Sequence, residues 1–371
     1  VPVPPHRFEG GPRGGRPRFV CCASTAYRLR QCIAERALIA HVAGMSRTLR
    51  FAALALLGAC ARPNAATPAA SRAPEIIGHR GAAGLAPENT LAAFSRGCAE
   101  GATGIELDVH VAGDGTLVVH HDYALHPDLT RDSLGAFSIR DPRPQLHTMS
   151  LAAIRTSVVG GLRPGSDYAK RHPEQQAVDG ERVPTLDEVI TRFQRDCAPP
   201  ARLVVEIKTD PTQPTFSAAP DDVVQRTVAL LRARGVTKRA QIIAFDWRAI
   251  MAAHRLAPEI PTSVLTAEGR TERDWNTIQI GRTGASEWMG GLDVDSVGGS
   301  IPQAIRRIGG RNWSPNAGNV TPERLEEAHR LGIRVFPWTV NDTTEMKRLL
   351  AMGVDGITTD RPDLLRALLR R

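Results

Sequence analysis

The stretch GIELDVHV, residues 104–111, has the apolar, β-branched composition of a buried strand but carries two acidic side chains. Side chains along a strand alternate between its two faces, so Glu106 and Asp108 point to one side and the intervening Leu107 to the other. A buried parallel strand tolerates charge poorly. Two carboxylates on one face of such a strand therefore predict a site that uses both.

Two other short stretches have the same character. GHRG at 78–81 closes a short apolar run, and EIK at 206–208 ends another run with Glu206 and Lys208 on one face. An acid pair, an acid beside a lysine and a histidine–arginine pair at successive strand ends predict a metal and phosphate site.

From residue 75 onward, strand patterns alternate with helix patterns, and a further extended piece at 116–120 follows the second strand. Eight strands with intervening helices predict a TIM (β/α)₈ barrel in one domain over 75–371. An open doubly wound sheet is the alternative, because the fifth and sixth strands are weak. The predicted strands are 75–78, 104–111, 202–207, 241–245, 262–265, 312–315, 334–340 and 356–360. The predicted helices are 89–100, 185–196, 221–234, 248–256, 322–331, 344–352 and 362–369, with a further one possible at 303–308.

Two long segments lack this regularity. Residues 123–183 are polar and punctuated by proline and glycine, which predicts a functional insertion after the second strand. Residues 266–310 contain tryptophans and several glycines, and their pattern is too irregular for a prediction beyond the helix at 303–308.

The charge of the chain lies at its N-terminal end. Eleven arginines and two glutamates give residues 1–72 a net charge of +9, against +8 for the whole chain, so the remainder carries −1. The near-neutral body argues against nucleic-acid binding.

Residues 45–60 have the layout of an export signal. A basic start at 45–50 precedes an apolar run at 51–59 that is too short to span a bilayer, and small residues precede Cys60. The order resembles a bacterial lipobox, so we expect a lipid anchor at Cys60, a tether at 61–74 and a periplasmic or membrane-anchored location. A plain signal peptide is the alternative. Residues 1–44 are interpreted as an over-extended gene start or, less simply, a disordered arm.

Beyond Cys60 only Cys98 and Cys197 remain, and the sequence leaves open whether they pair or stay as buried thiols. No cluster of cysteine and histidine typical of a metal site is present in the sequence.

The candidate residues for chemistry are three carboxylates, two histidines and two cations. Glu106, Asp108 and Glu206 offer hard oxygen ligands, suited to Ca²⁺ or Mg²⁺ rather than Zn²⁺. His79 and His121 are the candidate proton-transfer pair, since imidazole titrates near neutral pH. Each of these groups could alternatively be a structural residue or ion-pair partner at the barrel mouth.

Arg80 offers a planar fork for phosphate oxygens and Lys208 a second positive charge, although both could equally form salt bridges with the carboxylates. His120 is expected to face away from His121 and to be structural.

The order of these motifs resembles the glycerophosphodiester phosphodiesterase family from about residue 75 to the C-terminus. The motifs are HRG at 79–81, PENT at 87–90, ExD at 106–108, HD at 121–122, ExK at 206–208, WTVN at 338–341 and GxxTDxP at 356–362. The resemblance implies a TIM barrel with an insertion after the second strand. It implies metal ligands at Glu106, Asp108 and Glu206, an acid/base pair at His79 and His121, and phosphate contacts from Arg80 and Lys208. Trp338 would line the substrate pocket.

The chain departs from this family at the fourth strand, where Ala244-Phe245 replaces the usual Ser-Phe pair, and residues 266–310 match poorly. We assign Phe245 to the substrate pocket together with Trp338. Glu88 and Asn89 would orient the site, although Asn89 could instead cap the first helix.

The expected function is metal-dependent hydrolysis of glycerophosphodiesters to glycerol 3-phosphate and an alcohol. Two alternatives stay open: phospholipase D-like cleavage of lysophospholipids to a cyclic phosphate, and a lipoprotein that binds a phosphate ligand without turnover. No nucleic-acid or protein partner is expected, and the membrane is contacted only through the anchor at Cys60.

Overall fold

The computed structural model describes residues 73–370, except 140, 269–275 and 282–283. The predicted N-terminal extension, export signal and most of the tether lie outside the described residues. The sheet and its helices, described below, belong to residues from 72 onward.

Eight parallel strands form the sheet at the centre of the fold, in the order β8-β7-β6-β5-β4-β2-β1-β9. The two ends of this row meet, because the Thr358 amide donates to the Pro337 carbonyl at 2.9 Å and the Asp355 amide to the Val335 carbonyl at 3.0 Å. The predicted TIM barrel is confirmed, and the open sheet is wrong. The strands are β1 (Glu75–Gly78), β2 (Gly104–Val111), β4 (Arg202–Ile207), β5 (Ala240–Ala244), β6 (Thr262–Thr266), β7 (Asn312–Pro315), β8 (Arg334–Val335) and β9 (Gly356–Thr359).

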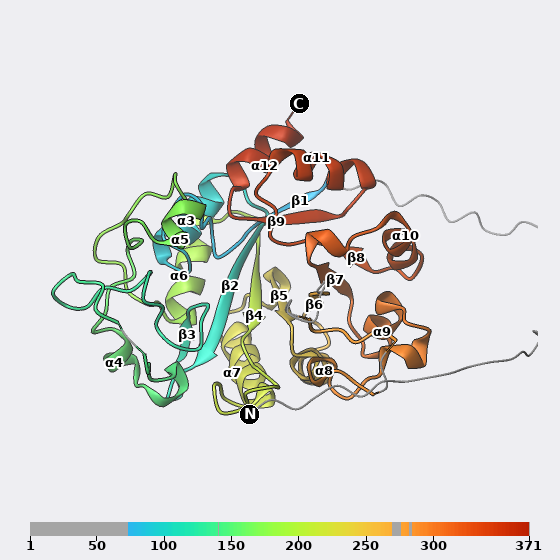
Figure 1. Ribbon diagram of the computed structural model, residues 1–371, viewed down its shortest axis with the longest axis horizontal. Coiled ribbons are helices and arrows are strands. Elements are labelled where there is room, and N and C mark those ends of the chain that lie inside the picture. The colour runs from blue at the N-terminus through green and yellow to red at the C-terminus, as the bar shows by residue number, and fades with distance from the viewer. Residues whose placement is uncertain (1–72, 140, 269–275, 282–283, 371) are drawn as a thin grey trace, which may run out of the picture. The chain divides into compact units, whose positions relative to one another are not determined.

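Helices surround this ring of strands on the outside (Figure 1). They are α3 (Leu91–Ala99), α6 (Leu186–Asp196), α7 (Pro220–Ala233), α8 (Trp247–Leu256), α9 (Ile301–Arg307), α10 (Pro322–Arg330), α11 (Thr343–Met352) and α12 (Pro362–Leu369). Short 3₁₀ helices lie at Leu146–Thr148, Thr237–Arg239, Glu287–Met289, Val294–Val297 and Ala317–Asn319. None of the helices in the described residues has both the length and the apolarity needed to span a bilayer.

The alternation of strand side chains divides the apolar core into two parts. Outward-facing residues such as Leu107 and Val205 pack against the helices in one large cluster. Inward-facing residues form a separate small cluster inside the barrel: Ile77, Val204, Ile243, Leu265 and Phe336. Along β4, Val204 belongs to this inner cluster and Glu206 is the next residue on the same face, so the apolar layer leads directly to the acidic residues of the site.

Several predicted element boundaries differ from the structure, most of them by one or two residues, and two differences have a clear structural reason. The strand expected at 334–340 is assigned only at Arg334–Val335, but the chain stays paired with β7, since the Phe336 and Trp338 amides donate to Trp313 and Pro315 carbonyls. The helix expected from Asn89 begins at Leu91, with Thr90 as its N-cap.

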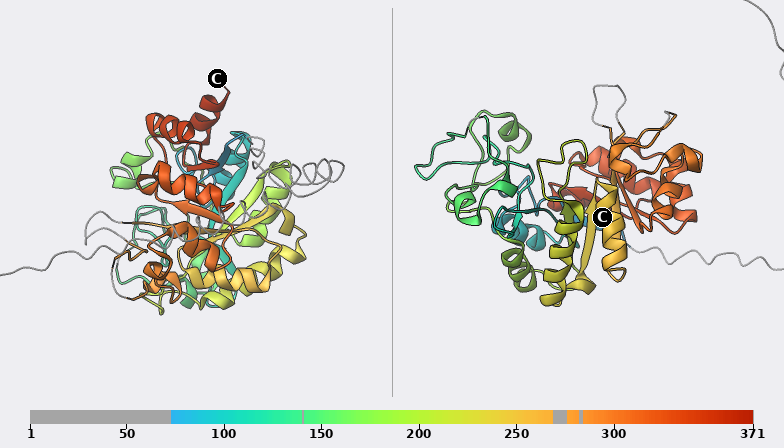
Figure 2. Two further views of the ribbon diagram at one scale, coloured as in Figure 1. Left: turned by 90° about the vertical axis from the view of Figure 1, so that its right-hand side faces the viewer. Right: turned by 90° about the horizontal axis from the view of Figure 1, so that it is seen from below.

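The predicted insertion leaves the barrel after β3 (Leu117–Val119), which pairs antiparallel with β2. It projects from one flank of the barrel (Figure 2) and contains α4 (Leu151–Ile154) and α5 (Asp167–Arg171). Its own small core includes Leu146, Ile154 and Val183, packed on Val118 of β3.

Cys98 of α3 and Cys197 at the end of α6 form a disulfide, with their Cα atoms 5.3 Å apart. This settles the alternative that the sequence left open. The bond joins two adjacent helices on the outside of the barrel.

Candidate active site

Three carboxylates from two neighbouring strands gather at the carboxyl end of the barrel. Glu106 and Asp108 come from β2 and Glu206 from β4, where Asp108 and Glu206 are register partners. The three side chains are 2%, 1% and 8% exposed, and ligand oxygens from each lie within 4.8 Å of one another. Parallel strands and a shared face are enough to explain this convergence.

Two cations only partly balance this cluster. Lys208 Nζ lies 2.8 Å from Glu206 Oε1 and 3.4 Å from Asp108 Oδ1, and Arg80 Nε lies 3.6 Å from Asp108 Oδ2. Burial alone would raise the pKa of Asp108, but Lys208, His121 and Arg80 lower it below its ordinary range.

Glu106 has the opposite environment. Burial and the negative charges of Asp108 and Glu206 raise its pKa to about 8, against partial opposition from His79. The neighbours therefore do not neutralise a third negative charge in this cluster. A divalent cation that prefers hard oxygen ligands would offset this charge, so the three residues present fit such an ion.

The HRG and PENT motifs meet in one strained loop beside the carboxylates. Arg80 and Asn89 have φ angles of +48° and +56°, a conformation that costs a non-glycine residue energy and is concentrated at functional sites. The Arg80 amide donates to Glu106 Oε2 at 2.7 Å, and Asn89 Nδ2 donates to Asp108 Oδ2 at 2.7 Å. Asn89 is thus a support for Asp108 and not a helix cap.

Gly81 follows in the same loop with a φ of +90°, and a Cβ there would lie 2.5 Å from the backbone of Ala93 in α3. Only glycine combines this conformation with that close approach. The third position of the HRG motif therefore requires glycine.

Arg80 is held by Glu88, whose Oε1 accepts from Arg80 Nη1 at 2.7 Å. Arg80 Nε is buried and makes no hydrogen bond within the described residues. The guanidinium therefore keeps donor capacity next to the carboxylate cluster, as a phosphate contact requires.

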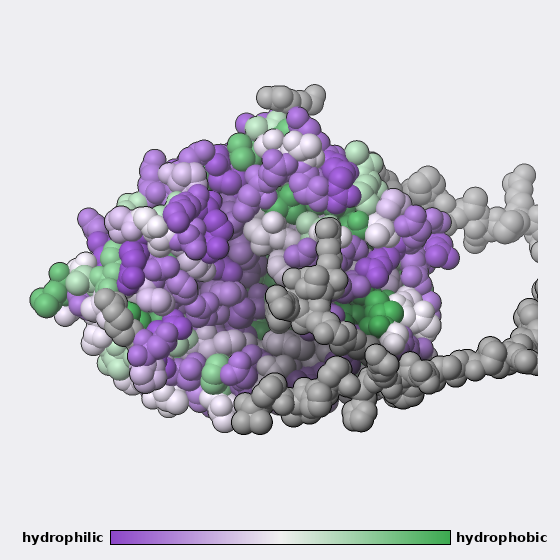
Figure 3. Space-filling model, viewed as in Figure 1, coloured by the Kyte–Doolittle hydropathy of each residue, from purple (hydrophilic) through white to green (hydrophobic). Residues whose placement is uncertain are grey.

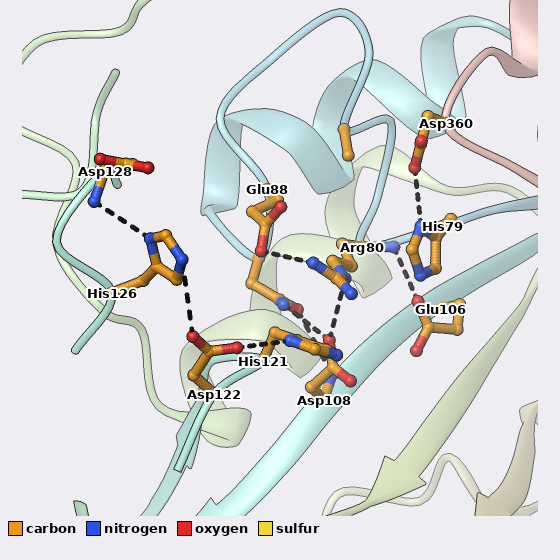
Figure 4. A network of polar contacts seen from close by, with 12 residues as sticks. His79, Arg80, Glu88, Glu106, Asp108, His121, Asp122, His126, Asp128 and Asp360 are labelled. Atoms are coloured by element: carbon orange, nitrogen blue, oxygen red, sulfur yellow. Dashed lines mark hydrogen bonds and ion pairs between the residues drawn. The ribbon is translucent and has the colours of Figure 1, made fainter. Parts of the chain in front are cut away.

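His79 is tied to the last strand of the barrel. Its Nδ1 lies 2.6 Å from Asp360 Oδ1 (Figure 4). Asn341 Nδ2 donates to the other oxygen, Asp360 Oδ2, at 2.6 Å. Because the carboxylate can only accept, Nδ1 carries the proton. Burial and Arg80 oppose protonation of the ring, but Asp360 and Glu106 outweigh them and raise the pKa of His79.

His121 has a carboxylate partner of its own but a different electrostatic environment. Its Nδ1 lies 2.7 Å from Asp122 Oδ1. Burial, Arg80 and Lys208 lower the pKa of His121 to about 3. In the view of Figure 4, the His79 and His121 rings lie on either side of the Arg80 guanidinium. The two histidines thus favour opposite protonation states.

The neighbouring His120 is 4% exposed and lines a separate small cavity, away from the carboxylate cluster. Most of the candidate site residues instead share one large cavity of about 540 Å³. Its lining includes His79, Arg80, Glu106, His121, Glu206 and Lys208. The surface on the face seen in Figure 3 is largely hydrophilic.

The model of the glycerophosphoryl diester phosphodiesterase family matches residues 79–364. The chain belongs to this family. It is 28% identical over 296 residues to a glycerophosphodiester phosphodiesterase of Caldanaerobacter subterraneus subsp. tengcongensis, covering 80% of this chain and 98% of that protein.

Solved structures agree with this assignment. A Silicibacter pomeroyi protein named as a candidate glycerophosphoryl diester phosphodiesterase is 34% identical, with a TM-score of 0.68 and coverage of 80% of this chain and 93% of that one. An Oleispira antarctica phosphodiesterase in complex with the product sn-glycerol-3-phosphate shares the fold at 20% identity, with a TM-score of 0.58 and coverage of 80% and 97%. The chain is thus an enzyme of the glycerophosphoryl diester phosphodiesterase family.

In this family member, aromatic side chains form part of the wall of the large cavity. The Phe245 and Trp338 rings meet edge to face at 5.3 Å, and Trp338 Nε1 donates to the Ser314 carbonyl at 2.8 Å. Both residues line the cavity, where the sequence placed them. The sequence missed four further aromatic residues of this lining: Tyr123, Phe216, Trp288 and Phe336.

Sequence reasoning also assigned no role to the partners of the phosphodiesterase histidines. Asp360 and Asn341 were visible only as parts of the TDxP and WTVN motifs, and Asp122 as the residue after His121. Their strand-end positions were the available signal, since inward-facing polar residues there converge on one rim.

Proposed function

We propose that this chain hydrolyses glycerophosphodiesters to glycerol 3-phosphate and an alcohol, using a divalent cation, Ca²⁺ or Mg²⁺, held by Glu106, Asp108 and Glu206. The observation that carries the proposal is the shared cavity. Two carboxylates of the cluster, two histidines with carboxylate partners and the guanidinium of Arg80, whose buried Nε has no hydrogen-bond partner within the described residues, all line it.

The cation would supply electrostatic stabilisation of the negative charge that develops on the phosphate. Arg80 binds a phosphate oxygen through its spare donors, and Glu88 keeps the guanidinium in place at 2.7 Å. Lys208 adds a positive charge beside the phosphate and stays protonated, because Glu206 and Asp108 raise its pKa despite burial.

The environments of the two histidines support different roles in this proposal. Asp360 and the nearby Glu106 favour the charged form of His79, so His79 donates a proton from Nε2 to the leaving alkoxide. Arg80 and Lys208 favour the neutral form of His121, and Asp122 holds the Nδ1 proton. His121 Nε2 is then free to accept the proton of the attacking nucleophile.

The test is an assay of the purified protein on glycerophosphodiesters and on lysophosphatidylcholine, with Ca²⁺, Mg²⁺ or EDTA. Glycerol 3-phosphate formed from a glycerophosphodiester, only with a metal present, is the expected result. A cyclic phosphate from lysophosphatidylcholine would favour the phospholipase D-like alternative. Tight binding of the diester without turnover would favour the non-catalytic one.

We further propose that the protein is exported and anchored through Cys60 in the periplasm or on a membrane. The Cys98–Cys197 disulfide supports export, because structural disulfides are typical of oxidising compartments. Mass spectrometry of the protein expressed in a bacterium tests this: acylation at Cys60 that is lost in Cys60→Ser is expected. A soluble, unprocessed chain in the cytoplasm would contradict it.

A further inference from the structure

A second, smaller cavity adjoins the large one at the histidine–arginine motif. Its volume is about 310 Å³, and it shares His79, Arg80 and Thr339 with the lining of the large cavity. The remaining lining is polar and consists of Glu88, Tyr168, Arg171, His172, Asn341 and Asp360. We call this space the insertion-side pocket.

One wall of the insertion-side pocket comes from the insertion, through Tyr168 and Arg171 of α5 and the following His172. The chain just after this wall is tied to the barrel. Glu174 pairs with Arg361 at 2.9 Å, and Gln175 Nε2 donates to the Ala83 carbonyl at 2.7 Å. Contacts with the barrel therefore hold this wall in place at the carboxyl end of the barrel, in addition to the packing within the insertion.

One cation that lines this pocket differs from the others in having no carboxylate partner within the described residues. Glu88 is paired with Arg80 at 2.7 Å, and Asp360 with His79 at 2.6 Å. The Arg171 guanidinium lies over the Tyr168 ring, 4.7 Å from its centroid, and forms no ion pair within the described residues. Arg171 thus brings to the pocket a positive charge that no carboxylate of the described residues pairs with.

The other groups contributed by the insertion are neutral hydrogen-bonding groups. Burial and the nearby Glu88 raise the pKa of Tyr168 to about 12, so its phenol stays protonated. Burial lowers the pKa of His172, which keeps its ring uncharged near neutral pH. A cation, Arg171, already lies over one face of the Tyr168 ring, so a second cation near this ring would meet a like charge.

We propose that the insertion-side pocket binds the second alcohol of the phosphodiester and selects alcohols that carry oxygen acceptors over those that carry a trimethylammonium group. This inference rests on the proposed function. A phosphodiester has two ester arms that diverge from one phosphorus atom, and the two cavities diverge from the residues assigned to phosphate binding and leaving-group protonation, Arg80 and His79. Arg171 and His172 are then specificity residues.

The experiment compares glycerophosphoserine with glycerophosphocholine, which share the glycerol 3-phosphate half and differ in the second alcohol. The wild-type protein is expected to have the higher kcat/KM for glycerophosphoserine. Arg171→Ala is expected to lower kcat/KM for glycerophosphoserine about tenfold, as the loss of one charge-assisted hydrogen bond does. The same substitution should change kcat/KM for glycerophosphocholine by less than about twofold.

Lys170→Ala is the matched control, because Lys170 is exposed on the same helix and pairs with Asp167 without lining the pocket. Equal losses on both substrates in Arg171→Ala, or none on either, would overturn the proposal. If the wild-type protein turns over neither substrate with metal, the proposed function fails instead. Calorimetric binding of both diesters to wild type and Arg171→Ala then tests the pocket, and equal affinities in the two proteins would reject it.

Discussion

Asp360 and His79 are 281 positions apart in sequence, yet Asp360 Oδ1 lies 2.6 Å from His79 Nδ1. This contact joins the carboxyl ends of the first and last strands of the chain, since β1 and β9 are neighbours in the sheet. Asn341 completes the arrangement by donating to the second oxygen of Asp360 at 2.6 Å and accepting from the Asp360 amide at 2.9 Å. The proposed acid role of His79 thus depends on two residues that no local pattern connects to it.

Asp360→Asn should lower kcat roughly 10- to 100-fold with little change in KM, because a neutral amide orients His79 but no longer favours its charged form. The pH dependence of kcat should shift at the same time, with activity lost at a lower pH on the alkaline side. Steady-state kinetics from pH 5 to 9 measure both effects. Asp363→Asn is the control, since Asp363 pairs with Arg361. A wild-type pH profile in Asp360→Asn would contradict the assignment.

The same pair should make stability depend on pH. The pKa of Asp360 falls from 3.8 to about 2 in the fold, because His79 outweighs burial, so its contribution is complete above pH 3.8 and is lost as the pH falls toward 2. The pKa of His79 is raised above 6.5, so its contribution is complete below pH 6.5 and is lost as the pH rises through the raised value.

Urea unfolding of wild type and Asp360→Asn should therefore differ most between about pH 4 and 6.5. The difference should shrink by about 2 kcal/mol on acidification to pH 2, the free energy that corresponds to the lowered pKa of Asp360. A difference that stays constant across this range would show that the pair contributes through packing alone.

His121→Ala should abolish turnover, with kcat lowered by at least about 100-fold, and leave the fold intact. His121 is partly exposed and pairs only with the partly exposed Asp122, so the free energy of unfolding should change by less than about 1 kcal/mol. Kinetics and urea unfolding measure the two quantities separately. His254→Ala, an exposed histidine on α8, is the matched control. Wild-type rates in His121→Ala would refute its role as the base.

The strands and helices were predictable from the sequence because each has its own apolar period and clear start and stop residues. The Thr185–Glu188 capping box and Pro220 at the start of α7 are examples. The carboxylate cluster was predictable too, since strand alternation places Glu106 beside Asp108 and parallel pairing brings Glu206 next to them.

What could not be predicted depends on long-range closure or on local strain. The left-handed conformation of Asn89 removes it from the helix that its sequence favours, and only the fold supplies Asp108 as its partner. Phe216 and Trp288 lie in irregular segments, where no period indicates which side chains face the cavity. The insertion-side pocket likewise needs α5 to be placed over the rim, which no pattern within residues 123–183 specifies.

Metal binding should be measurable without substrate. Titration with Ca²⁺ or Mg²⁺ should raise the melting temperature, and EDTA should reverse this, since an ion bound only by the folded state stabilises it. Glu106→Gln should remove the metal-dependent rise but change metal-free stability at pH 7 by less than about 1 kcal/mol. The reason is that a carboxyl group with a pKa of about 8 is already mostly protonated there. Glu326→Gln, an exposed position on α10, should retain the full rise. An unchanged rise in Glu106→Gln would remove Glu106 from the ligand set.

The Cys98–Cys197 disulfide closes a loop of 99 residues that contains β2, β3 and the whole insertion. Constraining so long a loop in the unfolded chain should contribute roughly 3–5 kcal/mol to stability. A reductant should therefore lower the free energy of unfolding of the wild-type protein in urea by this amount. The double variant Cys98→Ser/Cys197→Ser should have the stability of the reduced wild type, and the reductant should not change it. Alkylation of both thiols in the native, unreduced protein would show instead that they are free. In that case the support that the disulfide gives to export would be lost, while the barrel and its carboxylate cluster would stand unchanged.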